Sequence, residues 1–303
     1  MLEKIKNLKQ KHNAIVLAHY YQDPEIQDMA DFVGDSLELS RKAARTDAEV
    51  ILFCGVHFMA ETAKIVNPNK KVIIPDIEAG CSLADSAPAE EFRAWLKNYP
   101  NHVVISYINC SAEVKAMSDI ICTSANARQV IDSVPKNKKI VFAPDRLLGK
   151  YMIKETGRDM VLWNGTCQVH EMFSEKALVT LKVKNPAAKV LAHPECDESI
   201  LMHADFIGST SALIKNVNNT KEDQYIIVTE PGVIHQMQKA NPQKEFIPLP
   251  TKTGCACNEC PHMRLNTMEK IVNSLENMNH EITLDEDIRK KALRPLNKML
   301  EIV

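Results

Sequence analysis

The sequence lacks any apolar run that approaches the ~18 residues needed for a membrane-spanning helix. Its first six residues alternate charged and apolar side chains, which is unlike the apolar centre of a secretion signal. Positive charge is not in excess either, because the formal net charge is −2 and both signs are interspersed. This distribution offers no basic stripe for nucleic acid or for an anionic membrane. We therefore expect a soluble cytoplasmic protein with neither a nucleic acid nor a membrane as its partner.

Glycine is scarce, with 9 among 303 residues, and no low-complexity tract is present. A hydrophobic content of 45% and a charged content of 25% allow a large core, divided among two or three compact domains. The nine cysteines are the unusual part of the composition. Because the cytoplasm keeps thiols reduced, we expect metal ligands, catalytic groups or buried apolar side chains rather than disulfides.

A seven-residue motif, [Ala/Ser]-Asp-[Phe/Ile]-[Val/Ile]-x-x-[Ser/Thr], occurs three times, at residues 30–36, 118–124 and 204–210. Its aspartates, Asp31, Asp119 and Asp205, are 88 and 86 positions apart. This regularity indicates a threefold internal repeat of one unit of roughly 87 residues. Functional residues are then expected where equivalent points of the three units converge.

Each unit contains four short apolar runs rich in Val and Ile, separated by segments of helix length. Such runs are typical of strands buried on both faces of a parallel sheet. The predicted strands are 15–19, 103–107 and 189–193, then the motif itself, then 51–53, 140–142 and 225–228, and finally 72–74, 160–163 and 245–247. Helix starts are marked by the capping residues Asp23, Ser111 and Asp197. The predicted fold class is α/β, with three similar three-layer αβα domains whose parallel sheets lie around a pseudo-threefold axis.

Polar segments interrupted by proline, at 98–102 and 185–189, predict where the domains meet. The first domain is expected at 1–100, the second at 101–187 and the third at 188–262. The segment 263–303 is predicted to be helical and to pack on the first domain.

Polar side chains recur at the predicted carboxyl ends of the strands, where parallel sheets bind ligands. Twelve residues before each motif aspartate stands His19, Tyr107 or His193, and two residues further stands Tyr21, Asn109 or Glu195. The hydroxyl residues that end the second strands are Ser36, Ser124 and Thr210. A hydroxyl beside the free N–H groups of a helix start suits a carboxylate or phosphate, although an isolated one is more often a simple cap. Recurrence in three copies favours a shared site for a small substrate with several negative charges.

One cysteine per repeat follows the fourth strand, at Cys81, Cys167 and within the segment 255–260. Three thiolates suit an iron-sulfur cluster that keeps one iron without a protein ligand, open to a substrate oxygen. A local zinc site is the alternative, built from Cys255, Cys257, Cys260 and His262. It would leave the other two loop cysteines unexplained, and its first spacing is tighter than zinc sites usually have. Buried apolar positions are expected for Cys54, Cys110, Cys122 and Cys196.

Six motifs together carry a resemblance to a known family: 18–22 (AHYYQ), 34–37 (GDSL), 55–61 (GVHFMAE), 123–126 (TSAN), 192–196 (AHPEC) and 260–267 (CPHMRLNT). Over nearly the whole chain the sequence resembles the quinolinate synthases, the A proteins of bacterial NAD biosynthesis. The resemblance implies a [4Fe-4S] cluster at the bottom of a central cavity between three α/β domains. It also implies the reaction, in which iminoaspartate condenses with dihydroxyacetone phosphate to quinolinate, with release of phosphate and water. An aspartate oxidase or dehydrogenase that produces iminoaspartate would then be a possible transient partner.

By position, the family's cluster ligands fall on Cys81, Cys167 and Cys260, the last fixed by the Pro-x-Met-x-x-Asn-Thr stretch that follows. Cys255 and Cys257 are then additional thiols.

Roles for the remaining candidates are hypotheses. The dicarboxylate would be held by His19, Ser36, Tyr107, Asn109 and Ser124, and the triose phosphate or its product by His193, Ser209 and Thr210. Ile108 and Pro194, which lie between the paired polar residues, are expected to line the substrate site. Tyr21, Glu195 and His193 are the catalytic candidates, the first two for proton transfer. Two other functions stay open: an iron-sulfur hydro-lyase for a hydroxy-acid, and a metal-responsive binding protein.

Overall fold

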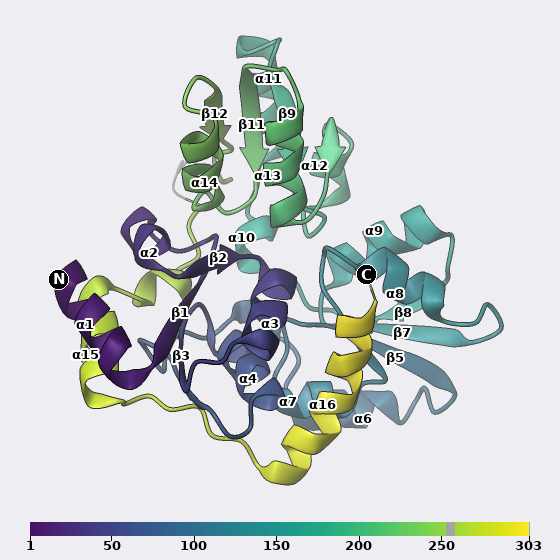
Figure 1. The fold of residues 1–303 in the computed structure, drawn as a ribbon. Helices are drawn as coiled ribbons and strands as arrows, with labels where there is room; N and C mark the ends of the chain where they lie inside the picture. The colour runs from purple at the N-terminus through teal and green to yellow at the C-terminus, as the bar shows by residue number, and fades with distance from the viewer. Residues whose placement is uncertain (253–257, 303) are drawn as a thin grey trace.

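Three four-stranded parallel sheets, each flanked by helices, make up the computed structural model, which describes residues 1–252 and 258–302 (Figure 1). The first sheet is formed by β1 (Ala14–His19), β2 (Phe32–Gly34), β3 (Val50–Cys54) and β4 (Lys71–Ile73). The second is formed by β5 (His102–Tyr107), β6 (Ile120–Cys122), β7 (Lys139–Ala143) and β8 (Met160–Leu162). The third is formed by β9 (Lys189–Ala192), β10 (Phe206–Ile207), β11 (Gln224–Val228) and β12 (Glu245–Pro248).

All three sheets have the same strand order. Counted within each domain, the second strand lies at one edge, followed by the first, the third and the fourth. The predicted α/β class and the three similar αβα domains are therefore confirmed, and the observed strands agree with the predicted ones to within a few residues at each end. The pseudo-threefold axis itself stays a prediction.

Helices connect the strands and cover both faces of each sheet. Between β1 and β5 the chain forms α2 (Pro24–Met29), α3 (Ser36–Arg45), α4 (His57–Val66), α5 (Ser82–Asp85) and α6 (Ala89–Leu96), after the N-terminal α1 (Leu2–His12). Between β5 and β9 it forms α7 (Ala112–Ala116), α8 (Ala127–Ser133), α9 (Arg146–Thr156), α10 (Gln168–Glu171) and α11 (Glu175–Lys184). After β9 come α12 (Glu198–Leu201), α13 (Thr210–Asn219), α14 (Val233–Ala240), the 3-10 turn η1 (Met263–Leu265), α15 (Met268–Asn277) and α16 (Glu286–Glu301). None of the helices in the described chain combines the length and hydrophobicity that crossing a membrane requires.

The strands are buried on both faces because successive apolar residues point into different layers. In β1, Leu17 packs into one hydrophobic cluster, whereas Val16 and Ala18 on either side of it pack into another. All three side chains are fully buried. A continuous apolar run is therefore what the three-layer arrangement requires of its central strands.

The aspartate of the repeated motif has the same structural role in each domain. Asp31, Asp119 and Asp205 each accept a hydrogen bond through Oδ2 from a backbone N–H near the start of the first strand, at 2.8, 2.9 and 2.9 Å. The backbone N–H of each aspartate donates to the carbonyl of that same strand residue, which is Val16, Val104 or Val190. The motif thus fixes the crossover between the first two strands, and this explains its recurrence without a catalytic role for the aspartate.

The helix before each first strand packs on the sheet that follows it. Phe92 of α6 lies in one cluster with Val104 of β5, and Leu178 of α11 lies in one cluster with Val190 of β9. The boundaries expected at 100/101 and 187/188 leave these two helices with the preceding domain. Because the apolar faces of both helices are buried against the following sheet, we propose that the second and third domains begin just before α6 and α11.

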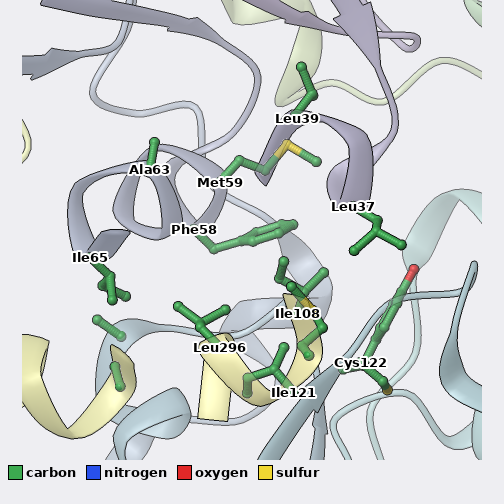
Figure 2. Close-up of a cluster of buried hydrophobic side chains, with 14 of the residues drawn as sticks. Leu37, Leu39, Phe58, Met59, Ala63, Ile65, Ile108, Ile121, Cys122 and Leu296 are labelled. Carbon is green, nitrogen blue, oxygen red and sulfur yellow. The ribbon is translucent and has the colours of Figure 1, made fainter. Parts of the chain in front are cut away.

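The C-terminal segment is helical as predicted, but it contacts two domains. Residues of α15, including Ile271, join the cluster that contains Ile5 of α1 in the first domain. The next helix, α16, contacts α7 and β6 of the second domain and α4 of the first. Its Leu296 lies beside Phe58 and Ile121 in a cluster that extends through both domains (Figure 2). Helix α16 therefore packs across the junction between the first and second domains.

Candidate functional site

A cavity with about 710 Å³ of empty space, part of it open to solvent, is lined by residues from all three domains. Among its lining residues are His19, Tyr21, Ser36, Cys81, Tyr107, Asn109, Ser124, Cys167, His193, Glu195, Thr210 and Cys260. Sequence reasoning predicted each of these as a site residue. Phe58 and Met59 form part of the apolar wall and belong to the hydrophobic cluster of Figure 2.

Three predicted site residues do not line this cavity. Ile108 is buried in the hydrophobic core, and its N–H donates to the Cys122 carbonyl at 2.8 Å. Pro194 is buried as well. Ser209 is the N-cap of α13, where its hydroxyl accepts from the Ala212 N–H at 3.3 Å. Its hydroxyl is therefore already used for helix capping.

His19 and His193 end or follow the first strands of their domains and have the same local geometry. The Nδ1 atom of His19 accepts from the Tyr21 N–H at 3.1 Å, and that of His193 accepts from the Glu195 N–H at 3.4 Å. An accepting Nδ1 leaves the ring proton on Nε2. Burial is the main cause that lowers the pKa of each histidine to about 3. Both rings are therefore neutral, and each can donate from Nε2 to a substrate oxygen.

Glu195 is the centre of a buried hydrogen-bond network. The Tyr107 hydroxyl donates to Oε1, and Nδ1 of His170 lies 3.0 Å from Oε2. Nε2 of the same imidazole is 2.9 Å from the Thr229 hydroxyl. Burial alone would raise the pKa of Glu195, but His193, His170 and the tyrosine outweigh it and lower the pKa to about 2. The carboxylate is therefore ionised and held in one orientation from two sides.

Tyr21 extends from the first domain to the third. Its hydroxyl lies 3.1 Å from Oγ1 of Thr210 and 2.8 Å from Oγ1 of Thr229. Burial is the largest cause that raises the pKa of Tyr21 well above its usual value. The side chain therefore remains a phenol that can donate its proton.

The hydroxyls at the second strand ends differ in their helix context. Ser36 and Thr210 are the first residues of α3 and α13, whereas Ser124 lies three positions before the first residue of α8. In α3 the N–H groups of Leu37 and Glu38 already donate to the Asp35 carboxylate. An anion at Ser36 would consequently meet the hydroxyl but not these two N–H groups. The prediction of free N–H groups thus failed at α3, because a capping aspartate precedes the serine.

The three loop cysteines share one backbone setting. The carbonyls of Cys81, Cys167 and Cys260 each accept from the N–H four residues later, at 2.9, 2.9 and 3.2 Å. Each cysteine therefore begins a helical turn. Burial is the dominant effect and raises the pKa of each cysteine, and backbone hydrogen bonds from that turn partly oppose it because they favour the thiolate.

The three thiols are also close enough to influence one another. Burial, followed by smaller effects that include the neighbouring Cys260, raises the pKa of Cys81 to about 12. Cys81 in turn contributes to the raised pKa of Cys167, for which burial is again the largest cause. Bare thiols in this setting are protonated, so a bound metal would have to displace their protons.

The other cysteine predictions have mixed outcomes. The four cysteines expected at buried apolar positions are buried and do not line the cavity: Cys54, Cys110, Cys122 and Cys196. Of the alternative zinc set, Cys260 and His262 line the cavity, whereas Cys255 and Cys257 lie outside the described residues.

A further possible ion-binding group combines a cysteine with residues of the Glu195 network. Ligand atoms of Cys167, His170 and Glu195 lie within 4.8 Å of one another. His170 was missed by sequence reasoning, although its Nδ1 lies 3.3 Å from the Cys167 sulfur and its ring stacks on His193 at 4.7 Å. The equivalent positions, three residues after the other cysteines, are Ala84 and Met263, so the repeat gave no signal.

Sequence reasoning also missed the ends of the third strands. The strand register makes Val56, Asp145 and Glu230 equivalent, and the last two are fully buried carboxylates. Glu230 lines the cavity. Burial is the main cause that raises its pKa to about 8. Carboxylates follow the third strands in only two of the three domains, because Val56 occupies the position in the first, so the motif does not recur through the repeat.

Sequence comparison relates the chain to known proteins. A sequence profile of the family described as Quinolinate synthetase A protein matches residues 3–301. The protein named quinolinate synthase from Nostoc sp. is 60% identical over 298 residues, which cover 98% of this chain and 92% of that protein. The quinolinate synthase of Chloroherpeton thalassium is 59% identical over 303 residues, which cover 100% of this chain and 94% of that protein. The chain therefore belongs to the Quinolinate synthetase A protein family.

Proposed function

We propose that this protein is a quinolinate synthase of NAD biosynthesis, which condenses iminoaspartate with dihydroxyacetone phosphate and releases phosphate and water. The named relatives support this activity. The observation that carries the proposal is the convergence of one cysteine from each repeat on a cavity whose other polar residues suit an anionic substrate. Two neutral imidazole donors, several hydroxyls and a buried carboxylate are the groups that such a condensation needs.

The residues that would hold a [4Fe-4S] cluster are Cys81, Cys167 and Cys260. They fit the cluster because they are soft ligands on one cavity, each with backbone N–H groups directed to its sulfur. Such a cluster, with one iron lacking a protein ligand, would polarise a substrate oxygen and assist loss of water.

The dicarboxylate would bind to neutral donors. His19 can donate from Nε2, and the hydroxyls of Ser36 and Ser124 face the same cavity. The Oδ1 atom of Asn109 is buried without a hydrogen-bond partner, so it can accept from a substrate N–H or O–H. A hydrogen bond from the substrate to this Oδ1 would favour the correct orientation of the nitrogen-bearing substrate, because a buried acceptor without a partner is unfavourable.

Glu195 and Tyr21 would divide the proton transfers. Glu195 is ionised and can accept a proton as enolisation begins, while Tyr21 is protonated and can donate one as a hydroxyl leaves. A carboxylate with a pKa of about 2 is a weak base. It would therefore hold the proton only briefly and return it to a substrate oxygen in a later step.

The test is anaerobic purification, counting of bound iron and sulfide, and measurement of quinolinate formed from the two substrates. Quinolinate formation that depends on the cluster supports the proposal. A protein with an intact cluster that forms no quinolinate but dehydrates a hydroxy-acid would instead be a hydro-lyase. Bound zinc in place of iron would favour the local zinc site.

A further inference from the structure

The three cysteine loops can be compared through the contact that ties each of them to the end of its third strand. In the first domain, the N–H of His57 donates to the Ala79 carbonyl at 2.7 Å. In the second, the N–H of Arg146 donates to the Gly165 carbonyl at 2.8 Å. In both cases the accepting carbonyl belongs to the residue two positions before the loop cysteine. The first two loops are thus fixed by the same backbone hydrogen bond.

The third domain cannot form this bond. The strand register aligns Cys54, Ala143 and Val228, so the residues three positions later, His57, Arg146 and Pro231, are equivalent. Proline has no N–H to donate. In the third domain, the carboxylate of the preceding residue, Glu230, accepts instead from the backbone N–H of Cys260, at 3.3 Å from Oε1.

The Glu230 side chain is fixed on all sides. It has no exposed surface, its Oε2 accepts from the Gly232 N–H at 2.7 Å, and its Oε1 lies 3.0 Å from Nη2 of Arg264. Arg264 also donates through Nη1 to Asp23 of the first domain at 2.8 Å, and its backbone N–H donates to the Cys260 carbonyl at 3.2 Å. The N–H of the cysteine is therefore held by the carboxylate that pairs with Arg264, whereas its carbonyl accepts from a backbone N–H as in the other two loops.

We propose that Glu230 is a positioning residue that holds Cys260 in the cavity in place of the backbone hydrogen bond of the other two domains. The third cysteine then depends on a side-chain ion pair, whereas the first two depend on the backbone. Changing the Glu230 side chain can remove the former, whereas the latter is lost only where proline replaces the donor residue. As far as it concerns a cluster, this inference rests on the proposed function.

The experiment measures how fast the anaerobically assembled cluster is lost to a ferrous-iron chelator, followed as decay of its visible absorbance. Glu230→Gln keeps the size of the side chain, but its amide NH2 cannot accept a hydrogen bond, so the side chain can no longer accept from the N–H groups of both Cys260 and Gly232. We expect cluster loss at least about tenfold faster than in the parent, which corresponds to ~1.4 kcal/mol. Arg264→Lys keeps the positive charge but cannot bridge Asp23 and Glu230 in the same way, so a smaller acceleration is expected.

The matched control is Glu259→Gln. It makes the same chemical change next to Cys260, and the Glu259 carboxylate lies 3.3 Å from Nε of the same arginine, but its side chain is 48% exposed. We expect its cluster-loss rate to stay within about twofold of the parent, as is usual for an exposed ion pair. Equal acceleration by Glu259→Gln and Glu230→Gln would overturn the proposal, because the effect would then be one of charge alone.

A second measurement separates this inference from the proposed function. In the cluster-free protein, alkylation of Cys260 by iodoacetamide, mapped by peptide mass spectrometry, should be several-fold faster in Glu230→Gln, while alkylation of Cys81 stays unchanged. Unchanged Cys260 alkylation and parental cluster loss in this variant would refute the positioning role and leave the proposed function intact. A parent protein that binds no iron-sulfur cluster would refute the proposed function, and the alkylation rates would still test the role of Glu230.

Discussion

The first and second domains share one hydrophobic core, whereas the third domain has hydrophobic clusters of its own and makes several polar contacts with the other two. One cluster of buried side chains joins Leu37 and Phe58 of the first domain to Ile121 of the second, and Leu296 of α16 belongs to it as well (Figure 2). The two clusters of the third domain consist of its own buried residues, to one of which Tyr20 and Tyr21 add partly buried rings. The third domain is also the one that stands apart in Figure 1.

The polar contacts of the third domain involve the candidate site residues themselves. Tyr21 meets Thr210, His193 lies 3.2 Å from Ser124, and Glu195 accepts from the Tyr107 hydroxyl. Hydrophobic contacts tolerate small displacements, but hydrogen bonds weaken steeply when their geometry changes. A substrate that replaced these bonds would therefore also alter how the third domain is attached to the other two.

The largest effect is expected at the three loop cysteines, because one comes from each domain and all three line the shared cavity. Changing Cys81, Cys167 or Cys260 singly to Ala should abolish the visible absorbance of the cluster and all quinolinate formation, because each would supply one of only three protein ligands. Iron and sulfide counting after anaerobic purification checks this. Changing Cys255 or Cys257 to Ala is the control and should leave the cluster in place. A protein that loses its metal on Cys255→Ala but keeps it on Cys81→Ala would favour the zinc site.

Removing a shared core side chain should destabilise two domains together. Leu296→Ala empties a fully buried position that contacts both domains, and such truncations cost ~2–5 kcal/mol. The matched control is Leu213→Ala in the third domain, which is equally buried in a cluster of that domain. Amide hydrogen exchange should accelerate across the first and second domains in the former variant and within the third domain in the latter. If either substitution accelerated exchange equally in all three domains, the third domain would not have a hydrophobic core separate from that of the first two.

The third prediction separates chemistry from binding at the polar interface. Glu195→Gln keeps shape and hydrogen-bonding capacity but cannot act as a base, so turnover should fall at least ~100-fold with the cluster intact. Ser124→Ala should mainly weaken substrate binding, seen as a raised KM, because it leaves the carboxylate in place. Steady-state kinetics with both substrates checks the difference. Turnover of Glu195→Gln within a few-fold of the parent would remove Glu195 from the mechanism and leave Tyr21 as the leading candidate.

What the sequence predicted well is what the three repeats have in common. The strands, the sheet class and the convergence of the cysteine loops all follow from apolar runs and residue types that recur at fixed offsets. A pattern that is weak evidence for a strand or a site residue when it occurs once becomes strong evidence when it occurs three times at the same offsets.

What the sequence did not predict lies where the repeats differ. His170 and Glu230 have no polar counterpart in the first domain, where Ala84 and Val56 occupy the equivalent positions. The packing of α6 on the following sheet depends on long-range contacts of Phe92 that no local pattern specifies. Comparison of the repeats therefore cannot identify a residue such as Glu230, which is needed in one domain only because Pro231 lacks the N–H present in the other two.

The smallest effect is expected at the contact between α13 and α3, and it should depend on pH. The Ser211 hydroxyl donates to Asp35 and also lies 3.0 Å from Oε2 of Glu38, which ties the third domain to the first. Burial, followed by the nearby Glu38 charge, raises the pKa of Asp35 in the folded protein, while the serine hydroxyl opposes this. A raised carboxyl pKa means that the folded state is favoured when Asp35 is protonated, and this advantage is lost as pH rises from the unfolded pKa of ~3.9 through the folded one.

Ser211→Ala should therefore cost more stability at neutral pH than in acid. Where Asp35 is ionised, the variant loses a donor to a buried charge, worth ~1.5–3 kcal/mol, and where Asp35 is protonated it loses only a neutral hydrogen bond, worth ~0.5–1.5 kcal/mol. Thermal unfolding of parent and variant at pH 7 and pH 4 measures the difference. Ser118→Ala is the control, because the hydroxyl of this buried serine of the second domain lies 2.8 Å from the Val114 carbonyl and 2.7 Å from the Ser106 hydroxyl, neither of which titrates in this range. Its loss of stability should be the same at both pH values. If the loss for Ser211→Ala were also independent of pH, the contact of the third domain with the first would not depend on the charge of Asp35.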